Sequence, residues 1–291
     1  MTMSSSSIPD RFYKVIALHL IKNLMSRHGY QVPLILGIHG PTGSGKTYQC
    51  EQILSELGVG IFLISGGQLE SPKAGEPAQL IRTTYIAASD SNKRNPLKSD
   101  QKIYPLAVII INDIDTALGE WQLTQYSMNR QIVYEELMNL TDHPNEVEGR
   151  MTRRIPVILT GNDFTKLYPP LVRPGRMTTF EWKPTAEEKV LVVSHILPEL
   201  NQNECKSLVD EFFGQQVSFF SDLSSLAYDQ AVWDYATSFG ISYFLNELLN
   251  GKRVKLGRNI TYSHLRILAI KLAESSKFRN HLESTPNEAT K

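Results

Sequence analysis

Cysteine is scarce in this sequence, and so are long apolar runs. Only two of the 291 residues are cysteines, Cys50 and Cys205, which excludes a disulfide framework or a cysteine-rich zinc site and favours a reducing compartment. No apolar run approaches the ~20 residues that a membrane-spanning helix needs. The opening residues, MTMSSSSIPD, lack the basic and apolar regions of a signal peptide. We therefore expect a cytoplasmic protein that has no membrane partner.

An excess of charge of either sign is also missing. Lysine and arginine together number 30, and so do aspartate and glutamate, giving a formal net charge of zero. A protein that binds nucleic acid through its phosphates usually carries a clear basic excess. A local basic stretch, RMTRR at residues 150–154, does not outweigh this balance. We therefore expect no nucleic-acid partner.

What the chain does contain is an alternation of apolar runs and helical patterns over its first 182 residues. Continuous β-branched runs such as LAVIIIN are typical of strands buried on both faces, and their alternation with helices predicts a parallel α/β sheet flanked by helices. The expected strands are Val32–His39, Gly60–Ser65, Leu106–Asn112, Ile155–Asn162 and Thr178–Trp182. The expected helices are Asp10–Met25, Lys46–Leu57, Glu76–Ser89 and Gln125–Thr141.

The pattern changes after KPTAEEK, where almost everything up to about Phe278 reads as helix. Thr185, followed three residues later by Glu188, is a capping-box pattern at a helix start. We therefore expect two domains: an α/β domain over residues 1–182, and a helical domain with a frayed tail over residues 183–291.

A glycine-rich loop follows the first expected strand and precedes a helix. It matches the pattern G-x-x-x-x-G-K-[ST], in which backbone N–H groups surround phosphate oxygens, the lysine reaches the β- and γ-phosphates, and the threonine hydroxyl binds Mg²⁺. A glycine-rich turn without a ligand is a weak alternative, because the loop falls between a strand and a helix as the mechanism requires. The expected ATP-binding residues are Gly40, Pro41, Thr42, Gly43, Ser44, Gly45, Lys46 and Thr47.

Polar side chains follow the later strands. Asn112, Asp113 and Asp115 end the third strand, where acids beside a phosphate loop suit Mg²⁺ and activation of water. A solvated strand end is the alternative, and it fits Asp115 better than Asp113. Asn162 ends the fourth strand and could orient water, although a turn residue is the ordinary interpretation of a lone asparagine. Arg173 and Arg176, three residues apart in LVRPGRM, suit the charge of phosphoryl transfer or a surface ion pair.

The order of these motifs, followed by a helical lid, resembles the AAA+ ATPases, which implies a P-loop NTPase fold. Local stretches resemble the Rubisco activases more closely, from about residue 10 to residue 275. These stretches are SGGQLESPKAGEPAQLIR, IINDID, TQYSMNRQIV, LMNLTDHPNEV, VILTGNDFTKLYPPLVRPGRMTTFEW and SFFSDLSSLAYD. The resemblance implies a ring-forming remodeller that uses ATP and Mg²⁺ to free Rubisco active sites blocked by inhibitory sugar phosphates.

Matched residue by residue, the resemblance assigns further roles. Asn112 takes the place of the Mg²⁺-linked aspartate of most AAA+ proteins, and Asp113 takes that of the water-activating glutamate. Asn162 matches the sensor asparagine. Arg173 and Arg176 match arginine fingers that act on the nucleotide of a neighbouring subunit, so the resemblance implies self-association into a ring, a hexamer, or into a helical filament.

The sequence also departs from the activases. They carry an arginine in the lid where this chain has Ser224, and their DAGAGR is DTALGEW here, in a segment (Ala117–Leu123) that is expected to border a central pore. Neither a plant-type N-terminal extension nor a small-subunit-like module is present, which predicts a short cyanobacterial activase-like protein. Three functions stay open: an ATP-dependent remodeller of Rubisco, a nucleotide-binding factor that clusters Rubisco without reactivating it, and, distantly, a DNA-associated AAA+ loader.

Overall fold

The protein is described here by a computed structural model covering residues 8–26, 32–71, 73–92, 104–119, 128–251 and 260–284, with side chains up to residue 275. The chain forms two compact units that divide between Lys183 and Pro184, and each is described by itself. None of the helices in the described ranges combines the length and the apolar character that crossing a membrane requires.

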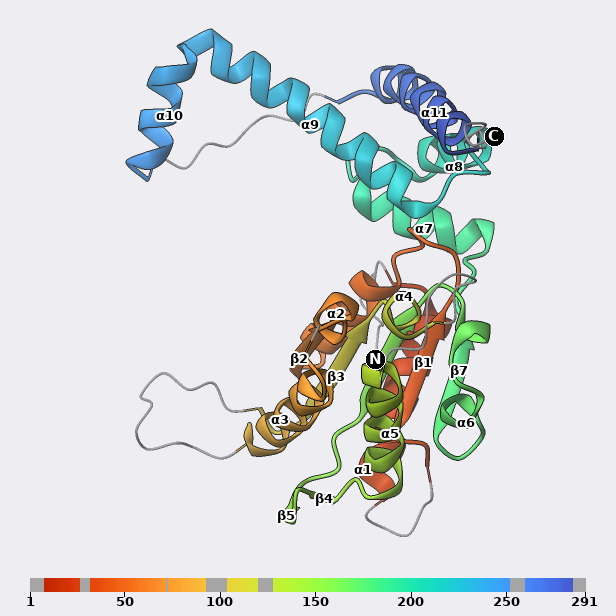
Figure 1. The fold of residues 1–291 in the computed structure, drawn as a ribbon. Coiled ribbons are helices and arrows are strands. Elements are labelled where there is room, and N and C mark those ends of the chain that lie inside the picture. The colour runs from red at the N-terminus through yellow and green to blue at the C-terminus, as the bar shows by residue number, and fades with distance from the viewer. Residues whose placement is uncertain are drawn as a thin grey trace, which may run out of the picture. The chain divides into compact units, whose positions relative to one another are not determined.

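The first unit contains the predicted parallel sheet (Figure 1). Its strands pair in the order β2-β3-β6-β1-β7, all in parallel. Because β6 lies between β1 and β3, the segments that follow these three strands meet at one edge of the sheet. The strands are β1 (Ile35–His39), β2 (Gly60–Ser65), β3 (Ala107–Asn112), β6 (Val157–Gly161) and β7 (Met177–Glu181).

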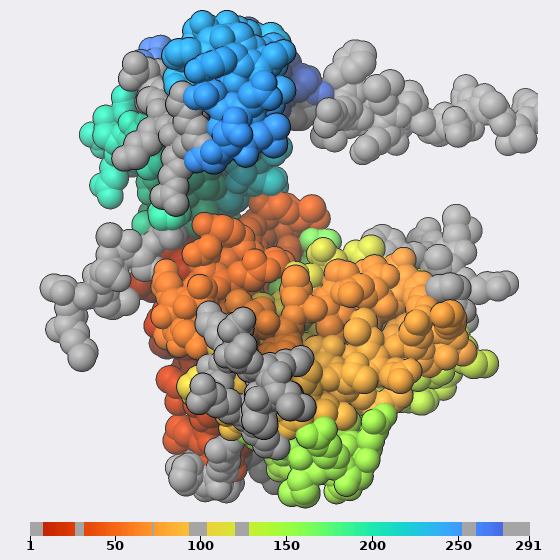
Figure 2. Space-filling model, turned by 90° about the vertical axis from the view of Figure 1, so that its left-hand side faces the viewer, coloured from red at the N-terminus to blue at the C-terminus, as the bar shows by residue number. Residues whose placement is uncertain are grey.

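Helices cover both faces of this sheet. Alternate residues of β3 enter different apolar cores: Ile109 and Ile111 face one, and Val108 and Ile110 face the other. The first core is closed by α3 (Glu76–Asp90), α4 (Ile114–Leu118) and α5 (Met128–Asp142). The second core is closed by α1 (Asp10–Met25) and α2 (Lys46–Glu56). Figure 2 shows the surface formed by α2 and α3 in orange.

Several short elements escaped prediction because they span too few residues to show a period. They are the hairpin β4 (Glu146–Val147) and β5 (Arg150–Met151), the 3₁₀ helices η2 (Gly66–Leu69) and η3 (Phe164–Lys166), and helices α4 and α6 (Pro169–Val172). Three strands also begin later than expected, β1 at Ile35, β3 at Ala107 and β6 at Val157. Gln125–Ser127 of the predicted Gln125–Thr141 helix lie outside the described residues.

The second unit is helical. It contains α7 (Ala186–Ile196), α8 (Gln202–Glu211), α9 (Val217–Phe239), α10 (Ile241–Leu249) and α11 (Tyr262–Ser284). The predicted capping box of Thr185 and Glu188 starts α7. Val193, Leu208, Phe220 and Leu265 belong to the core shared by α7, α8, α9 and α11. The second half of α9 leads away from this core to α10 (Figure 1), where Leu249 is 84% exposed.

Candidate nucleotide site

The glycine-rich loop connects β1 to α2 and encloses the ammonium group of Lys46. Lys46 Nζ donates to Gly40 O at 2.8 Å, to Pro41 O at 2.9 Å and to Asn162 Oδ1 at 3.2 Å. Burial lowers the pKa of Lys46, and the nearby charges of Asp113 and Asp115 counteract this effect. Carbonyl groups of its own loop thus hold the lysine. A bound phosphate would compete with these carbonyl groups for the ammonium group.

The backbone conformation of this loop requires glycine. Gly43 and Gly45 have φ values of 72° and 80°, in the left-handed region that glycine adopts without strain. A Cβ atom at Gly40 would lie 2.1 Å from Trp182 O. Thr42 is exposed and Pro41 half-buried, whereas the buried Ser44 Oγ finds no hydrogen-bond partner among the described residues. An orphan hydroxyl in a loop of this shape fits a phosphate-binding role.

A polar cluster joins the start of α2 to the ends of β3 and β6. Asn112 Oδ1 accepts from Thr47 Oγ1 at 3.3 Å and from Thr160 Oγ1 at 3.0 Å. Within the described residues, no group of three or more histidine, cysteine, aspartate or glutamate side chains could hold a metal ion. A Mg²⁺ ion at this cluster would rest on the oxygens of Thr47 and Asn112, beside the carboxylate of Asp113, a set that suits a cation that keeps several waters.

The two acids after β3 differ in a way that reverses the sequence interpretation. Asp113 is the exposed one, and its φ of 52° is unusual for a residue other than glycine. Asp115, expected to be the more solvated, is 1% exposed, and its Oδ2 accepts from the N–H groups of Asn162 and Asp163, both at 2.9 Å. Asp115 therefore fixes the backbone after β6, and Asp113 is the carboxylate left open for chemistry.

Asn162 lies beside the loop. Its Oδ1 accepts from Lys46 Nζ, and its carbonyl oxygen accepts from Gly40 N–H at 3.2 Å. Thr160, two residues earlier, was not predicted as part of the site. Its signal was a hydroxyl directly after the apolar residues Val157–Leu159 of β6.

Arg173 and Arg176 lie at the opposite end of the sheet from the loop. They precede β7, whose first residue pairs with Ile35, whereas the loop begins after His39 at the other end of β1. Four residue steps along β1 correspond to about 13 Å, more than an arginine side chain spans. Neither arginine can therefore reach the loop of its own chain.

The two arginines also differ from each other. Arg176 is held by α5, with Nη2 2.8 Å from Asp142 Oδ2, and it also donates to Pro170 O at 3.2 Å. Arg173 is exposed, and its guanidinium pairs with no described residue. Of the two, Arg173 is available to another subunit.

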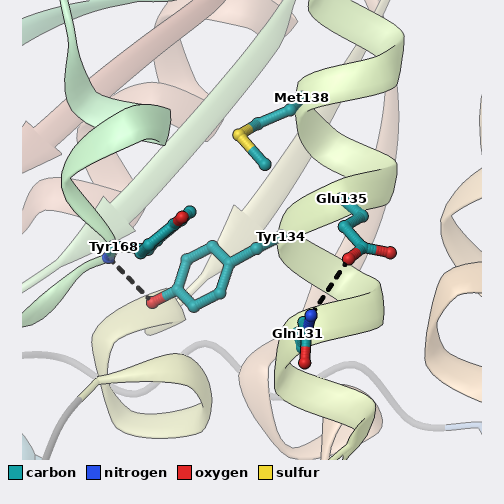
Figure 3. Close-up of a pocket in the computed structure, with 5 residues that line it drawn as sticks. All are labelled: Gln131, Tyr134, Glu135, Met138 and Tyr168. Carbon is teal, nitrogen blue, oxygen red and sulfur yellow. Dashed lines mark hydrogen bonds between the residues drawn. The ribbon is translucent and has the colours of Figure 1, made fainter.

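A hollow of about 300 Å³ opens between α5 and the segment before α6 (Figure 3). Tyr134 and Tyr168 lie side by side in it, with ring centroids 5.5 Å apart, and Tyr168 N–H donates to Tyr134 Oη at 3.2 Å. Met138, which also lines the hollow, contacts Arg176 Nη1 at 2.8 Å. The hollow thus adjoins the arginine that is held in place.

The structure describes Ser224, the position of the lid arginine in the activases, and part of the segment Ala117–Leu123. Ser224 Oγ on α9 donates to Ile196 O at the end of α7, at 3.2 Å, so this position carries no cation. Of the segment Ala117–Leu123, the structure describes Ala117, Leu118 and Gly119, which are buried. Residues 120–123, which include the last two letters of DTALGEW, lie outside the described ranges.

The comparisons with known proteins agree with this geometry. Residues 36–185, more than half of the chain, match the model of the ATPase family associated with various cellular activities (AAA). The chain belongs to the AAA family of ATPases. Residues 186–274 of this AAA protein match the model of the helical domain of ribulose bisphosphate carboxylase/oxygenase activase. This confirms the predicted resemblance and the α/β-plus-lid fold class.

Curated relatives named ribulose bisphosphate carboxylase/oxygenase activase are similar over most of the chain. The protein of Anabaena sp. is 41% identical over 270 residues, which are 89% of this chain and 63% of the relative. That of Nostoc sp. is 41% identical over 84% of this chain and 59% of the relative. The Chlamydomonas reinhardtii protein is 38% identical over 86% and 63%. This AAA protein therefore spans about three fifths of the length of these relatives.

Proposed function

We propose that this AAA protein hydrolyses ATP with Mg²⁺ in order to remodel Rubisco. The observation that carries the proposal is the meeting of Lys46, Thr47, Asn112, Asp113 and Asn162 at the carboxyl edge of one sheet. The names of the similar relatives point to Rubisco as the target.

Each residue of the site has a distinct task. The N–H groups of residues 40–47 and the ammonium of Lys46 bind the phosphates, and Thr47 and Asn112 bind Mg²⁺, which supplies charge stabilisation at the transferred phosphoryl group. Asp113 is the base that accepts a proton from water, and its open position suits that role. Asn162 orients the same water, held by its contact with Lys46.

The position of the two arginines implies that a complete site needs two neighbouring subunits. Because Arg173 and Arg176 lie at the far end of the sheet from their own loop, they complete the site of a neighbouring subunit. Arg173 supplies the cation, and Arg176 fixes the segment that carries it through Asp142. We propose a ring, a hexamer, or a helical filament in which each subunit lends Arg173 to the next.

A second function, clustering of Rubisco without reactivation, is favoured by one observation in the helical unit. The lid position that carries an arginine in the activases has a serine hydroxyl bonded to α7, so the lid has no cation there for sensing nucleotide. The DNA-loader alternative loses its support, because Arg150 pairs with Asp90 and the side chains of Arg153 and Arg154 donate to groups of the same chain.

One experiment separates the two functions. ATP hydrolysis and light scattering are measured with and without Rubisco, and carboxylation by Rubisco inhibited with a sugar phosphate is followed after ATP is added. A remodeller restores carboxylation only with ATP, and Lys46→Ala abolishes the effect, while the exposed Lys206→Ala does not. Scattering that rises without restored carboxylation establishes clustering instead, and no response to Rubisco in any assay refutes both.

A further inference from the structure

Trp182 connects the glycine-rich loop to the end of the α/β unit. It follows β7 directly and is completely buried. Its indole Nε1 donates to Ser44 O at 2.9 Å, and its own N–H donates to His39 O at 2.7 Å. Its carbonyl oxygen occupies the space where a Cβ atom at Gly40 would lie. Trp182 therefore contacts the loop both at its first residue and near its middle.

The bond to Ser44 O controls the direction of the next N–H group. A trans peptide is planar, so the carbonyl oxygen of Ser44 and the N–H of Gly45 point in opposite directions. With the oxygen directed to the Trp182 indole, the Gly45 N–H points away from Trp182. A loop that binds phosphate needs its N–H groups directed inward and its carbonyls outward, because an inward carbonyl would repel the anion.

The indole ring is itself held firmly. Phe12 of α1 packs edge-on against it, with ring centroids 4.9 Å apart. Arg11 Cζ lies 4.8 Å from the ring centroid on its face, and Arg11 Nη2 donates to Lys183 O at 2.6 Å. The same group of residues thus fixes both the loop and the point where the chain leaves the α/β unit.

We propose that Trp182 is a positioning residue that holds the glycine-rich loop in its phosphate-binding conformation and ties that conformation to the chain exit at Lys183. The inference rests on the proposed nucleotide site, which it deepens. Without the indole N–H, the Ser44–Gly45 peptide can rotate, and phosphate binding must then order it. Nucleotide affinity falls as a result, while the groups that carry out hydrolysis stay intact.

The test replaces the indole N–H alone. Trp182 is substituted by benzothienylalanine, in which sulfur replaces N–H at nearly equal shape, and Trp182→Phe is made in parallel. We expect ATP binding to weaken by about 3- to 10-fold, corresponding to one lost hydrogen bond, and KM for ATP to rise with kcat unchanged. Benzothienylalanine at the exposed Trp233 is the matched control and leaves both values unchanged.

A second measurement follows the exit. Hydrogen exchange at the Lys183 amide is compared with and without a non-hydrolysable ATP analogue at saturation. We expect the analogue to alter exchange in the unmodified protein and not in the benzothienylalanine variant. Equal affinities for the two proteins, or an equal response at Lys183, would overturn the inference. A failure of the unmodified protein to bind ATP would instead refute the proposed function.

Discussion

The two ends of the parallel sheet use polar residues in different ways. At the amino end of β6, Ile155 N–H donates to Tyr85 Oη at 3.0 Å, and Tyr85 Oη donates to Pro144 O at 2.8 Å. Burial raises the pKa of Tyr85 to about 12. Arg154 donates to Asn23 Oδ1 at 2.8 Å, with a pKa that burial lowers. These groups are enclosed and paired within the chain.

At the carboxyl end of the sheet, polar groups are left open or are bound to loop groups that a nucleotide could replace. Lys46 is bound to carbonyls of its own loop, Ser44 Oγ finds no partner among the described residues, and Asp113 is exposed in a left-handed conformation. Unusual backbone conformations and unsatisfied polar groups concentrate at functional sites. The difference teaches that substitution of an enclosed and paired group changes stability, whereas substitution of an open group at the carboxyl end changes nucleotide chemistry. Arg173 is the exception: it is exposed at the amino end, yet we expect its substitution to change nucleotide chemistry.

The largest effect is expected from Arg173. Arg173→Ala should bind ATP normally but hydrolyse it about 10³- to 10⁵-fold more slowly, the range seen for arginine fingers. Arg176→Ala should destabilise the α/β unit, because it breaks the contact with Asp142. Steady-state hydrolysis and thermal unfolding measure the two effects.

Mixing subunits tests the action between neighbours. A Lys46→Ala subunit keeps its Arg173 and can lend it to an Arg173→Ala neighbour that holds ATP, so mixing the two variants should restore part of the activity. Activity should also rise with protein concentration. Activity that is independent of concentration, with no rescue on mixing, would refute the action of Arg173 on a neighbouring subunit and break the distinction drawn for it.

The two acids after β3 give the next largest effect. Asp113→Asn keeps a residue that tolerates positive φ but removes the base, so turnover should fall about 10²- to 10⁴-fold while ATP stays bound. Asp115→Ala leaves two N–H groups without their acceptor and should cost about 1–3 kcal/mol of unfolding free energy for each. Single-turnover hydrolysis and denaturant unfolding separate these outcomes. Wild-type turnover in Asp113→Asn would show that another group activates water.

The sequence predicted the long elements well because their residues carry a clear period. The strand Gly60–Ser65 and the helix Asp10–Met25 have their predicted bounds. The contacts of Lys46 with Asn162 and of Thr47 with Asn112 follow from the same pattern, because parallel strands bring their carboxyl ends to one edge.

Burial and pairing could not be read from the sequence in the same way. Asp113 and Asp115 are two residues apart and chemically identical, yet the left-handed turn at Asp113 exposes one and buries the other. The contact of Trp182 with Ser44 joins residues 138 positions apart, and no local pattern reports it.

A smaller effect is expected in the helical unit. Ser224→Arg introduces the cation that the activases carry at this position and removes the bond to Ile196 O. If the guanidinium reaches a phosphate, a charge-assisted hydrogen bond of about 1–2 kcal/mol should tighten nucleotide binding roughly 5- to 30-fold. Fluorescence titration with an ATP analogue measures the change, with Ser225→Arg, exposed on the same helix, as the control. Equal affinity for both variants would place position 224 away from the nucleotide.

The smallest effect tests the enclosed end of the sheet through pH. His19 of α1 is 7% exposed, and burial, aided by the charges of Arg154 and Lys22, lowers its pKa from 6.5 to about 3. In the unfolded chain His19 therefore binds a proton below pH 6.5. In the folded chain it binds that proton only below about pH 3. The contribution of His19 to stability is complete well above pH 6.5 and is lost progressively as the pH falls toward 3, by about 1.4 kcal/mol between pH 7.5 and 5.5.

His19→Gln removes this titration, so the unfolding free energy of the variant should change less over that pH interval than that of the unmodified protein. His143→Gln, at an exposed histidine of the same unit, is the control and should keep the original dependence. Urea unfolding at a series of pH values gives the comparison. Because His19 lies at the amino end, ATP affinity at pH 7.5 should stay the same in both variants. A loss of affinity in His19→Gln would mean that the two ends of the sheet are coupled, and that the separation of stability from chemistry along β6 is wrong.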